Sequence, residues 1–441
     1  MNIEQIRAKA LSEPGGKNDG VRRTTEQPLP EHQGRVALRN CGLIDPDSIQ
    51  QYILYGKGYA GLARALTMDI KELADVLLPA ALRGRGEPWC SSAAAWAHWL
   101  KKGDADRCLI CDTADSDGVS AAARFIIEND PYSLLEGLLI AAYAVGAARC
   151  VVWTDGKSDP AGKLQRALKS MRDYGLLGKN ILDADFSMEI GVETVELPAG
   201  HRMELLRCLE ERKPLPHFSP RCDAAEGPAG RPVLAVSVEM MAALAGMLAS
   251  DREDYAGSKV ITLSSSAECV SVYEIPFRMT VRAFLDTAAD ETFKPQEIRA
   301  VRIGGSAGTI CPVDTADISA GCDEADEFRS SLGSGSIDLI AGDADIVEFT
   351  REAISRLQAG SCGRCVFCRE GSLQMLTVLE DICRGSGTPR DLDLLMELGE
   401  TMKTSSLCSY GRVLPNPVLS GIRHFRRDYE KRVGGPPVAD G

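Results

Sequence analysis

Histidine is scarce in this sequence, with five in 441 residues, and none of the five has a neighbour at the spacing of a metal-binding pair. The longest apolar stretch, residues 134–153, contains Glu136, Gly137 and Arg149, so it is too interrupted to cross a membrane as one helix. Basic residues do not outnumber acidic ones: the net charge is −13, which argues against nucleic acid or an anionic membrane as the main partner. An acidic protein that docks on other proteins fits these absences better.

A secretory leader is also missing from the start of the sequence. The residues Met1–Arg7 lack the charged start and apolar core of a signal peptide. The 15 cysteines are too few in 441 residues for a disulfide scaffold, so we expect reduced thiols and a cytoplasmic location.

What the sequence does contain is a group of cysteines near its C-terminus. Cys362, Cys365 and Cys368 are joined by two successive Cys-x-x-Cys steps, and Cys408 follows at a distance. Three closely spaced thiolates and one distant thiolate are typical of the ligands of a [4Fe-4S] cluster, which transfers single electrons. Zinc also accepts four thiolates, but its ligands more often form two separated Cys-x-x-Cys pairs. The spacing therefore predicts a cluster, with zinc or plain burial as the alternatives.

Other candidate groups receive a structural interpretation. Cys383 reads as a spare core cysteine of a helix, because a free thiol packs as a small hydrophobe. Cys108 and Cys111 form an isolated Cys-x-x-Cys, which we interpret as a strand edge with one buried thiol. A redox disulfide or a shared metal site is the alternative for this pair. No catalytic constellation stands out, so we predict no catalytic residue.

The pattern along the chain predicts an arm followed by three domains. Residues 1–30 are polar and read as a flexible arm. In residues 31–245 buried strands and helices alternate, which predicts an α/β layer fold. Residues 256–340 read as a small β-grasp-like module. Residues 345–433 read as a helical bundle with the cysteines at its helix ends.

Individual elements can be predicted from periodicity and from helix-start signals. The expected strands are 109–111, 150–153, 260–263, 270–275 and 301–305. The expected helices are 134–148, 164–174, 280–289, 346–359, 372–384, 390–402 and 418–433.

The C-terminal third resembles the NADH-binding flavoprotein subunit of respiratory complex I and its equivalents in NAD-linked hydrogenases and formate dehydrogenases. The matching segments are Ser361–Cys365, Cys368–Gly371, Leu407–Cys408, Pro415–Ser420 and Arg423–Arg426. The resemblance implies a flavin domain, a β-grasp-like module and a helical cluster domain in that order. It also implies that Cys362, Cys365, Cys368 and Cys408 hold a [4Fe-4S] cluster close to a flavin.

The FMN-phosphate loop of that family departs from its pattern in this chain. The family reads Gly-Arg-Gly-Gly-Ala-Gly-Phe-Pro-Thr-Gly-Leu-Lys-Trp, and residues 84–96 read Gly-Arg-Gly-Glu-Pro-Trp-Cys-Ser-Ser-Ala-Ala-Ala-Trp. Glu87 places negative charge where a phosphate should bind, and Pro88 removes an amide donor. Trp89 adds bulk in place of glycine, and Ala95 replaces the lysine. Together these changes oppose phosphate binding.

Other flavin and nucleotide signatures of the family are altered as well. Its Asn-Ala-Asp-Glu turn reads Asp112–Asp115 here, and its Arg-Gly-Glu-Tyr segment reads Thr154–Lys157. Residues 196–201 stand where relatives position the nicotinamide, and Val236–Met240 replaces Asn-Asn-Val-Glu-Thr. The sequence therefore predicts a retained fold with an eroded FMN and NADH pocket.

These inferences lead to one expected function and two alternatives. We expect an NADH dehydrogenase-like subunit that relays single electrons through one [4Fe-4S] cluster and has lost FMN and hydride transfer. One alternative is an active FMN-dependent NAD(P)H:acceptor oxidoreductase with an unusual phosphate loop. The other is a structural subunit whose cluster only stabilises the fold. The expected partners are other iron–sulfur or flavin subunits, among them a thioredoxin-like [2Fe-2S] subunit, and Arg369 is expected to donate to the cluster sulfurs.

Overall fold

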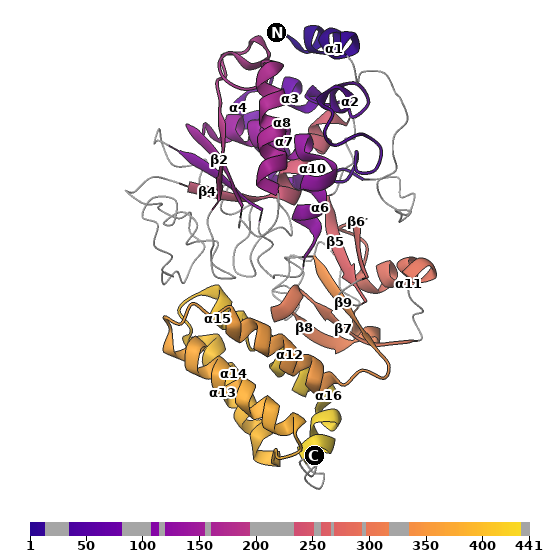
Figure 1. The fold of residues 1–441 in the computed structure, drawn as a ribbon, viewed down its shortest axis with the longest axis vertical. Coiled ribbons are helices and arrows are strands. Elements are labelled where there is room, and N and C mark those ends of the chain that lie inside the picture. The colour runs from indigo at the N-terminus through magenta and orange to yellow at the C-terminus, as the bar shows by residue number, and fades with distance from the viewer. Residues whose placement is uncertain are drawn as a thin grey trace.

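The protein is described by a computed structural model that places its elements along an elongated molecule (Figure 1). A parallel sheet with its helices forms one end, a second sheet lies in the middle, and a helical bundle forms the other end. The residues that the structure describes are 1–13, 35–81, 107–113, 120–154, 160–194, 233–250, 257–265, 269–292, 297–316 and 335–433.

The first sheet is wholly parallel and has the strand order β3-β2-β1-β4. Its strands are β1 (Cys108–Asp112), β2 (Arg149–Thr154), β3 (Ile190–Thr194) and β4 (Val233–Ser237). The chain proceeds from β1 through β2 to β3 on one side and then returns to place β4 on the other side of β1. The strand order therefore reverses between β1 and β4, which is where open α/β sheets bind ligands. The predicted α/β fold is confirmed.

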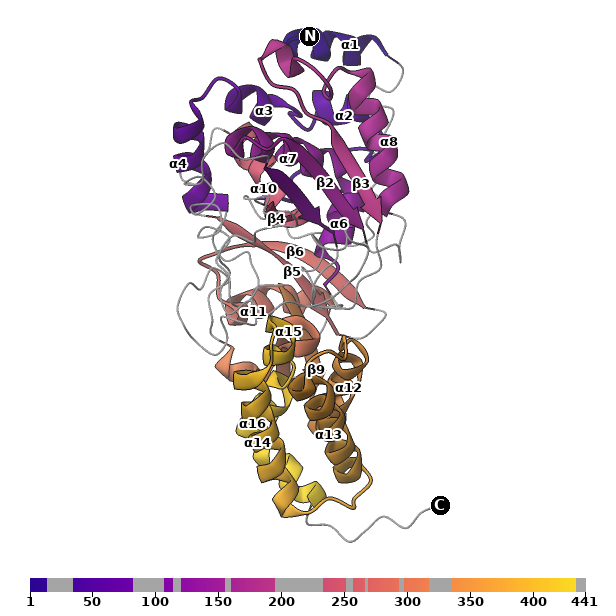
Figure 2. The same cartoon turned by 90° about the vertical axis from the view of Figure 1, so that its left-hand side faces the viewer.

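Helices cover one face of this sheet (Figure 2). They are α6 (Ala122–Asn129), α7 (Pro131–Val145), α8 (Pro160–Asp173) and α10 (Val238–Ala249). Almost every residue of α7 is buried, which explains the long apolar run that the sequence showed. A β-carbon on Gly137 would lie 1.9 Å from the Met241 carbonyl oxygen, so α7 and α10 pack in backbone contact.

The N-terminal residues form a helix where the sequence predicted a flexible arm. Helix α1 (Ile3–Ser12) begins with a capping box, in which Asn2 and Gln5 exchange side-chain hydrogen bonds with each other's backbone amides. Ile6 and Ala10 are fully buried. The prediction was wrong for this segment because one apolar stripe of a mostly polar helix is enough to dock it on the core. Three further helices follow, α2 (Ile49–Leu54), α3 (Ala60–Ala65) and α4 (Ile70–Ala81).

The second sheet is mixed and has the order β6-β5-β9-β7-β8. Its elements are β5 (Ser258–Ser264), β6 (Val270–Pro276), α11 (Val281–Thr292), β7 (Ile298–Ile303), β8 (Thr309–Pro312) and β9 (Ser336–Ala341). Strands β5 and β9 are parallel, and the other neighbours are antiparallel.

Short 3-10 turns lie in both units. One is Ile181–Asp183, between α8 and β3, and the other two, Gly305–Ala307 and Val313–Thr315, flank β8.

Buried carboxylates attach the first sheet and its helices to the second sheet. Glu239, in the first turn of α10, pairs with Lys259 of β5 at 3.2 Å and accepts the Val260 amide at 2.7 Å. Both partners of this ion pair are almost fully buried. Glu274 of β6 accepts the three consecutive backbone amides of residues 36–38 at 2.9–3.0 Å. Because each contact satisfies a buried charge, separating the two units would leave these charges unpaired.

The C-terminal bundle consists of five helices among the described residues. They are α12 (Ile346–Ala359), α13 (Val366–Cys383), α14 (Pro389–Ser405), α15 (Ser409–Val413) and α16 (Asn416–Val433). Helix α13 begins at Val366, six residues before the predicted start at Ser372, so it includes the last cysteine of the run. The difference arises because Gly363 turns the chain with φ of 75°, and Cys365 then takes the extended conformation of a helix cap.

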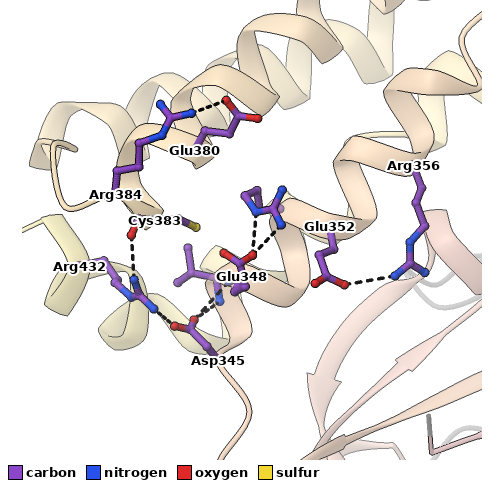
Figure 3. Close-up of polar contacts among 10 residues, drawn as sticks. Asp345, Glu348, Glu352, Arg356, Glu380, Cys383, Arg384 and Arg432 are labelled. Carbon is purple, nitrogen blue, oxygen red and sulfur yellow. Dashed lines mark hydrogen bonds and ion pairs between the residues drawn. The ribbon is translucent and has the colours of Figure 1, made fainter. Parts of the chain in front are cut away.

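Polar contacts close the end of the bundle away from the cysteine run (Figure 3). Asp345 caps α12 by accepting the Val347 and Glu348 amides, and it also pairs with Arg432 of α16. Arg432 also donates to the Cys383 carbonyl oxygen at 3.0 Å. One guanidinium therefore joins the start of α12 to the ends of α13 and α16. No helix of the described part of the chain is both long and apolar enough to cross a membrane.

Candidate metal centre

The structure brings the four predicted cysteines together. Cys362 lies in the loop between α12 and α13, Cys365 is the N-cap of α13, and Cys368 lies in the first turn of that helix. Cys408 is the N-cap of α15, which contacts α13. Cys365 and Cys368 are buried, and Cys362 and Cys408 are partly buried. A β-carbon on Gly411 of α15 would lie 3.1 Å from the Cys368 β-carbon, which shows how closely the two segments approach.

The thiols are near enough to influence one another's ionisation. Burial raises the pKa of Cys368 to about 11, and the charges of Cys408, Cys365 and Cys362 act in the same direction. Burial also raises the pKa of Cys408, with further contributions from Cys362 and Cys365. The raised pKa values favour neutral thiols at Cys368 and Cys408, and binding iron to these two sulfurs as thiolates would release protons.

This arrangement differs from a site for one metal ion. Within the described residues, no group of three or more His, Cys, Asp or Glu side chains is placed to hold a single ion. A four-iron cluster gives each thiolate its own iron atom, so its ligands stand farther apart than those of one tetrahedral ion. Four thiols that converge from two segments of the chain, with two of them buried, match the donor set that such a cluster requires.

Two helices, α13 and α15, begin directly after proposed ligands. Cys365 precedes the first turn of the 18-residue helix α13, whose N-terminal end carries partial positive charge. At Cys408, hydrogen bonds from the backbone amides of Gly411 and Tyr410 partly oppose the rise in pKa that burial causes. The Tyr410 hydroxyl donates to the Leu357 carbonyl oxygen at 2.5 Å, which fixes α15 against α12. These features favour an anionic group among the four sulfurs.

Arg369, the predicted donor to the cluster sulfurs, contacts the cysteine loop. Its Nη1 donates to the Gly363 carbonyl oxygen at 2.8 Å, and its Nε donates to Glu370 at 2.7 Å. The guanidinium therefore braces the cysteine loop and is not engaged by sulfur in this structure. Ser361 is a side chain that lies close to a sulfur: its Oγ is 3.4 Å from Cys368 Sγ. Its position directly before Cys362 was the available signal, and sequence reasoning did not use it.

Other predicted cysteines occupy the places expected of them. Cys111 is buried and Cys108 is partly buried, which confirms one buried thiol, but both lie in β1, which is paired with β2 and β4 and is therefore not an edge strand. Cys383 ends α13 and is partly buried. Burial raises the pKa of Cys383 to about 12, and its hydrogen bond with Glu348 acts in the same direction.

Of the region where the family resemblance places a flavin, the structure describes only the carboxyl edge of the parallel sheet. Residues 84–96, Asp115, residues 155–157 and residues 196–201 lie outside the described part. Asp112, at the end of β1, is paired in register with Ser237 of β4, where the strand order reverses. The last two residues of each strand include no lysine or arginine. Two of them, Asp112 and Glu193, are acidic. The described strand ends therefore supply no positive charge for a phosphate.

Comparison with known families finds two matching regions. Residues 348–432 match the NADH-ubiquinone oxidoreductase-F iron-sulfur binding region, and this segment contains all four cysteines. Residues 78–241 match the Nuo51 FMN-binding domain. The second match includes both the altered loop and the described parallel sheet.

Individual relatives resemble nearly the whole chain. The NADP-reducing hydrogenase subunit HndC of Solidesulfovibrio fructosivorans is 30% identical over 412 residues, which cover 91% of this chain and 84% of that protein. The F subunit of the NADH-quinone oxidoreductase of Aquifex aeolicus is 28% identical over 401 residues, covering 87% of this chain and 91% of that one.

A solved structure shares the fold. A chain of the NAD+-reducing [NiFe]-hydrogenase in its H2-reduced state has a TM-score of 0.72 with 22% sequence identity. The match covers 83% of this chain and 63% of that longer chain. At this level of identity the likeness concerns the fold alone.

Proposed function

This chain belongs to the family that contains the F subunit of NADH-quinone oxidoreductase and the hydrogenase subunit HndC, and on this premise we propose that it relays single electrons through one [4Fe-4S] cluster without bound FMN. The proposed ligands are Cys362, Cys365, Cys368 and Cys408. When bound, the cluster accepts and donates one electron at a time.

The convergence of the four cysteines is the observation that carries the cluster assignment. The sequence supplies them from two segments, and the fold joins these segments through the contact of α13 with α15. The buried Cys365 and Cys368 lie on the inner side of the site. The iron-sulfur binding region of the family spans the same residues, 348–432.

The absence of FMN is proposed from charge. Glu87, Pro88 and Ala95 replace residues of the family's phosphate loop, which removes a lysine and an amide donor and adds a carboxylate. At the carboxyl edge of the sheet, the buried Asp112 adds a further acidic group near the point where the strand order reverses. A phosphate at this edge would face acidic groups in place of the family's lysine and amides.

A second candidate function is an active FMN-dependent NAD(P)H:acceptor oxidoreductase. The match of residues 78–241 to the Nuo51 FMN-binding domain favours it, because the match includes the altered loop. A third candidate, a structural subunit with the cluster as a folding staple, predicts a cluster that no other subunit of the complex can reduce.

The domain boundaries proposed for this function are 31–245, 256–340 and 345–433, and helix α1 packs on the core of the first of these domains. The β-grasp-like character of 256–340 is supported by a mixed sheet in which the parallel neighbours β5 and β9 are flanked by β6 on one side and by β7 and β8 on the other. Helix α11 follows the first hairpin, β5–β6, as that module requires.

The proposed partners are other iron–sulfur or flavin subunits, including a thioredoxin-like [2Fe-2S] subunit. Large apolar side chains are exposed beside the proposed ligands: Val366 is 57%, Phe367 45% and Leu373 48% exposed on α13. Val366 and Phe367 lie between Cys365 and Cys368 in the sequence. Exposed apolar side chains of this kind mark surfaces that other proteins cover, and a partner docked here would bring its own redox centre close to the cluster.

The decisive experiment is to measure iron and flavin in the anaerobically purified native complex. About four irons per chain without stoichiometric FMN would support the relay. Four irons with one FMN would contradict the flavin-free proposal and favour the active oxidoreductase, so NADH oxidation would be tested next. Iron that dithionite reduces, but that no subunit of the complex reduces, would favour the structural role.

A further inference from the structure

A hydroxyl group lies beside one of the proposed cluster ligands. Ser361 Oγ is 3.4 Å from Cys368 Sγ, a distance at which sulfur takes part in hydrogen bonds. The same Oγ accepts a hydrogen bond from the Gly363 amide at 3.3 Å. The hydroxyl therefore bridges the turn of the cysteine loop and a ligand on α13.

The direction of this hydrogen bond follows from the chemistry of the two groups. A cysteine that binds iron does so as a thiolate, which has no proton to donate. The Gly363 amide already donates to Ser361 Oγ, so the serine's own proton remains available for a second partner. With the cluster bound, Ser361 is therefore the donor and Cys368 Sγ is the acceptor.

We propose that Ser361 raises the reduction potential of the cluster by donating its hydroxyl proton to Cys368 Sγ. This inference rests on the proposed function, because it requires the cluster at these cysteines. Reduction adds one negative charge to the cluster and its thiolates, so a donor to sulfur stabilises the reduced form more than the oxidised form. Cys368 is 5% exposed, and water competes little for its sulfur.

Arg369 is not an equivalent donor in this structure. Its guanidinium is bonded to the Gly363 carbonyl oxygen and to Glu370. It supports the turn that follows Ser361 through its hydrogen bond to Gly363. Ser361 is thus a positioning and tuning residue whose hydroxyl can be removed by a single substitution.

The test is the midpoint potential of the cluster in the native complex, measured by EPR-monitored potentiometry of wild type and Ser361→Ala. Loss of a hydrogen bond to a charged acceptor should shift the redox equilibrium about tenfold toward the oxidised form, which for one electron lowers the potential by about 59 mV. Ser361→Thr keeps a hydroxyl and should restore the wild-type potential. Ser386→Ala removes a serine whose hydroxyl bonds to the Asp381 carbonyl oxygen, and it should leave the potential unchanged.

Each alternative result overturns the proposal. An alanine variant with full iron content and an unchanged potential would show that the hydroxyl does not tune the cluster. Loss of iron from the alanine variant would assign Ser361 to holding the loop, and a threonine variant that behaves like alanine would point to side-chain volume. Absence of iron from the wild type would instead contradict the proposed function itself, so the two failures are distinguishable.

Discussion

Cys365 and Cys408 occupy equivalent positions in the bundle, since each is the residue that caps the start of a helix. Cys365 precedes α13 with φ of −91° and ψ of 121°, and Cys408 precedes α15 with φ of −120° and ψ of 168°. The first amides of a helix have no partner within it, so they point toward whatever lies beyond the cap. Two helix starts therefore face the same site, which favours an anionic cluster there.

Substitution of a ligand cysteine tests this assignment. Cys365→Ser should remove the cluster, because one of its four proposed thiolate ligands is lost, and should lower the melting temperature of the protein. Iron and sulfide content would fall well below about four irons per chain, and the EPR signal of the reduced cluster would disappear. The melting temperature should fall because a cluster that binds only the folded protein stabilises it, and this stabilisation is lost with the cluster.

Cys383→Ser is the matched control. Cys383 lies on the same helix, α13, but at its other end, where its thiol bonds with Glu348. This variant should keep its iron. Equal iron in both variants would contradict the assignment of Cys365 as a ligand.

The buried ion pair between Glu239 and Lys259 should contribute more to the free energy of unfolding than an exposed ion pair does. Glu239→Ala removes the carboxylate that pairs with the buried Lys259 and should cost about 3–5 kcal/mol, measured by urea unfolding. Glu189→Ala breaks an exposed pair with Arg172 and should cost less than about 1 kcal/mol. Similar losses in the two variants would mean that solvent screens the first pair as well.

Asp345 combines a helix cap and an ion pair, and two substitutions separate these roles (Figure 3). Asp345→Ala removes the acceptor for the Val347 and Glu348 amides and should cost about 1–2 kcal/mol. Asp345→Asn keeps an acceptor for the cap but loses the pairing with Arg432, so it should cost less. The prediction fails if asparagine destabilises the protein as much as alanine does.

Glu348 should contribute to stability in a pH-dependent manner. The hydrogen bond from Arg351 lowers the pKa of this carboxyl below its ordinary value of 4.5, against the effect of burial. A lowered folded-state pKa stabilises the fold above pH 4.5, and this contribution is lost as the pH falls from 4.5 through the lower folded-state pKa. Glu348→Gln should therefore be less stable than wild type at pH 7, by less than about 1 kcal/mol because the pair is partly exposed.

The matched test for Glu348 repeats the substitution in an Arg351→Gln background. There the difference between glutamate and glutamine should shrink, because the donor that lowers the pKa is gone. Unfolding by urea at several pH values measures both effects. A difference that persists unchanged at pH 3 would contradict the proposed origin.

Gly137 should tolerate no side chain. Gly137→Ala would force a β-carbon to within 1.9 Å of the Met241 carbonyl oxygen, so α7 and α10 would have to separate at a cost of about 3 kcal/mol. Gly191→Ala, on strand β3, is the control, since the nearest atom to its added β-carbon is the Cys150 carbonyl oxygen of β2, 3.9 Å away. Equal thermal stability of the two variants would show that the helix pair adjusts without cost.

Local patterns predicted about half of the helices and strands that the described residues form. Helix α12 was predicted with its observed bounds, Ile346–Ala359, because an apolar stripe and an acidic cap define it without help from the rest of the chain. Strands β1 and β2 are continuous apolar runs, as buried parallel strands are. Helix α1 was missed because the few apolar residues that dock it are decisive only once the core exists.

Pairing over long distances could not be predicted in the same way. The partners of Glu239 and Glu274 lie on separate elements, and no spacing in the sequence connects them. Ser361 lies beside Cys368 only because Gly363 reverses the chain between them. In each case the contact depends on where the backbone turns, which side-chain pattern alone does not specify.

The sequence by itself determined the chemistry of this protein: four thiols at cluster spacing, an altered phosphate loop, and a strand–helix alternation that specifies a layered fold. These are local properties, because a ligand's identity and a segment's periodicity belong to the residues themselves. Only the tertiary structure decided which groups meet. It brings Cys408 to Cys365, places the Ser361 hydroxyl beside Cys368, and pairs the buried carboxylates of Glu239 and Glu274 with partners on other elements. Those contacts form when packing of the apolar faces brings distant segments together and makes unpaired buried charges costly.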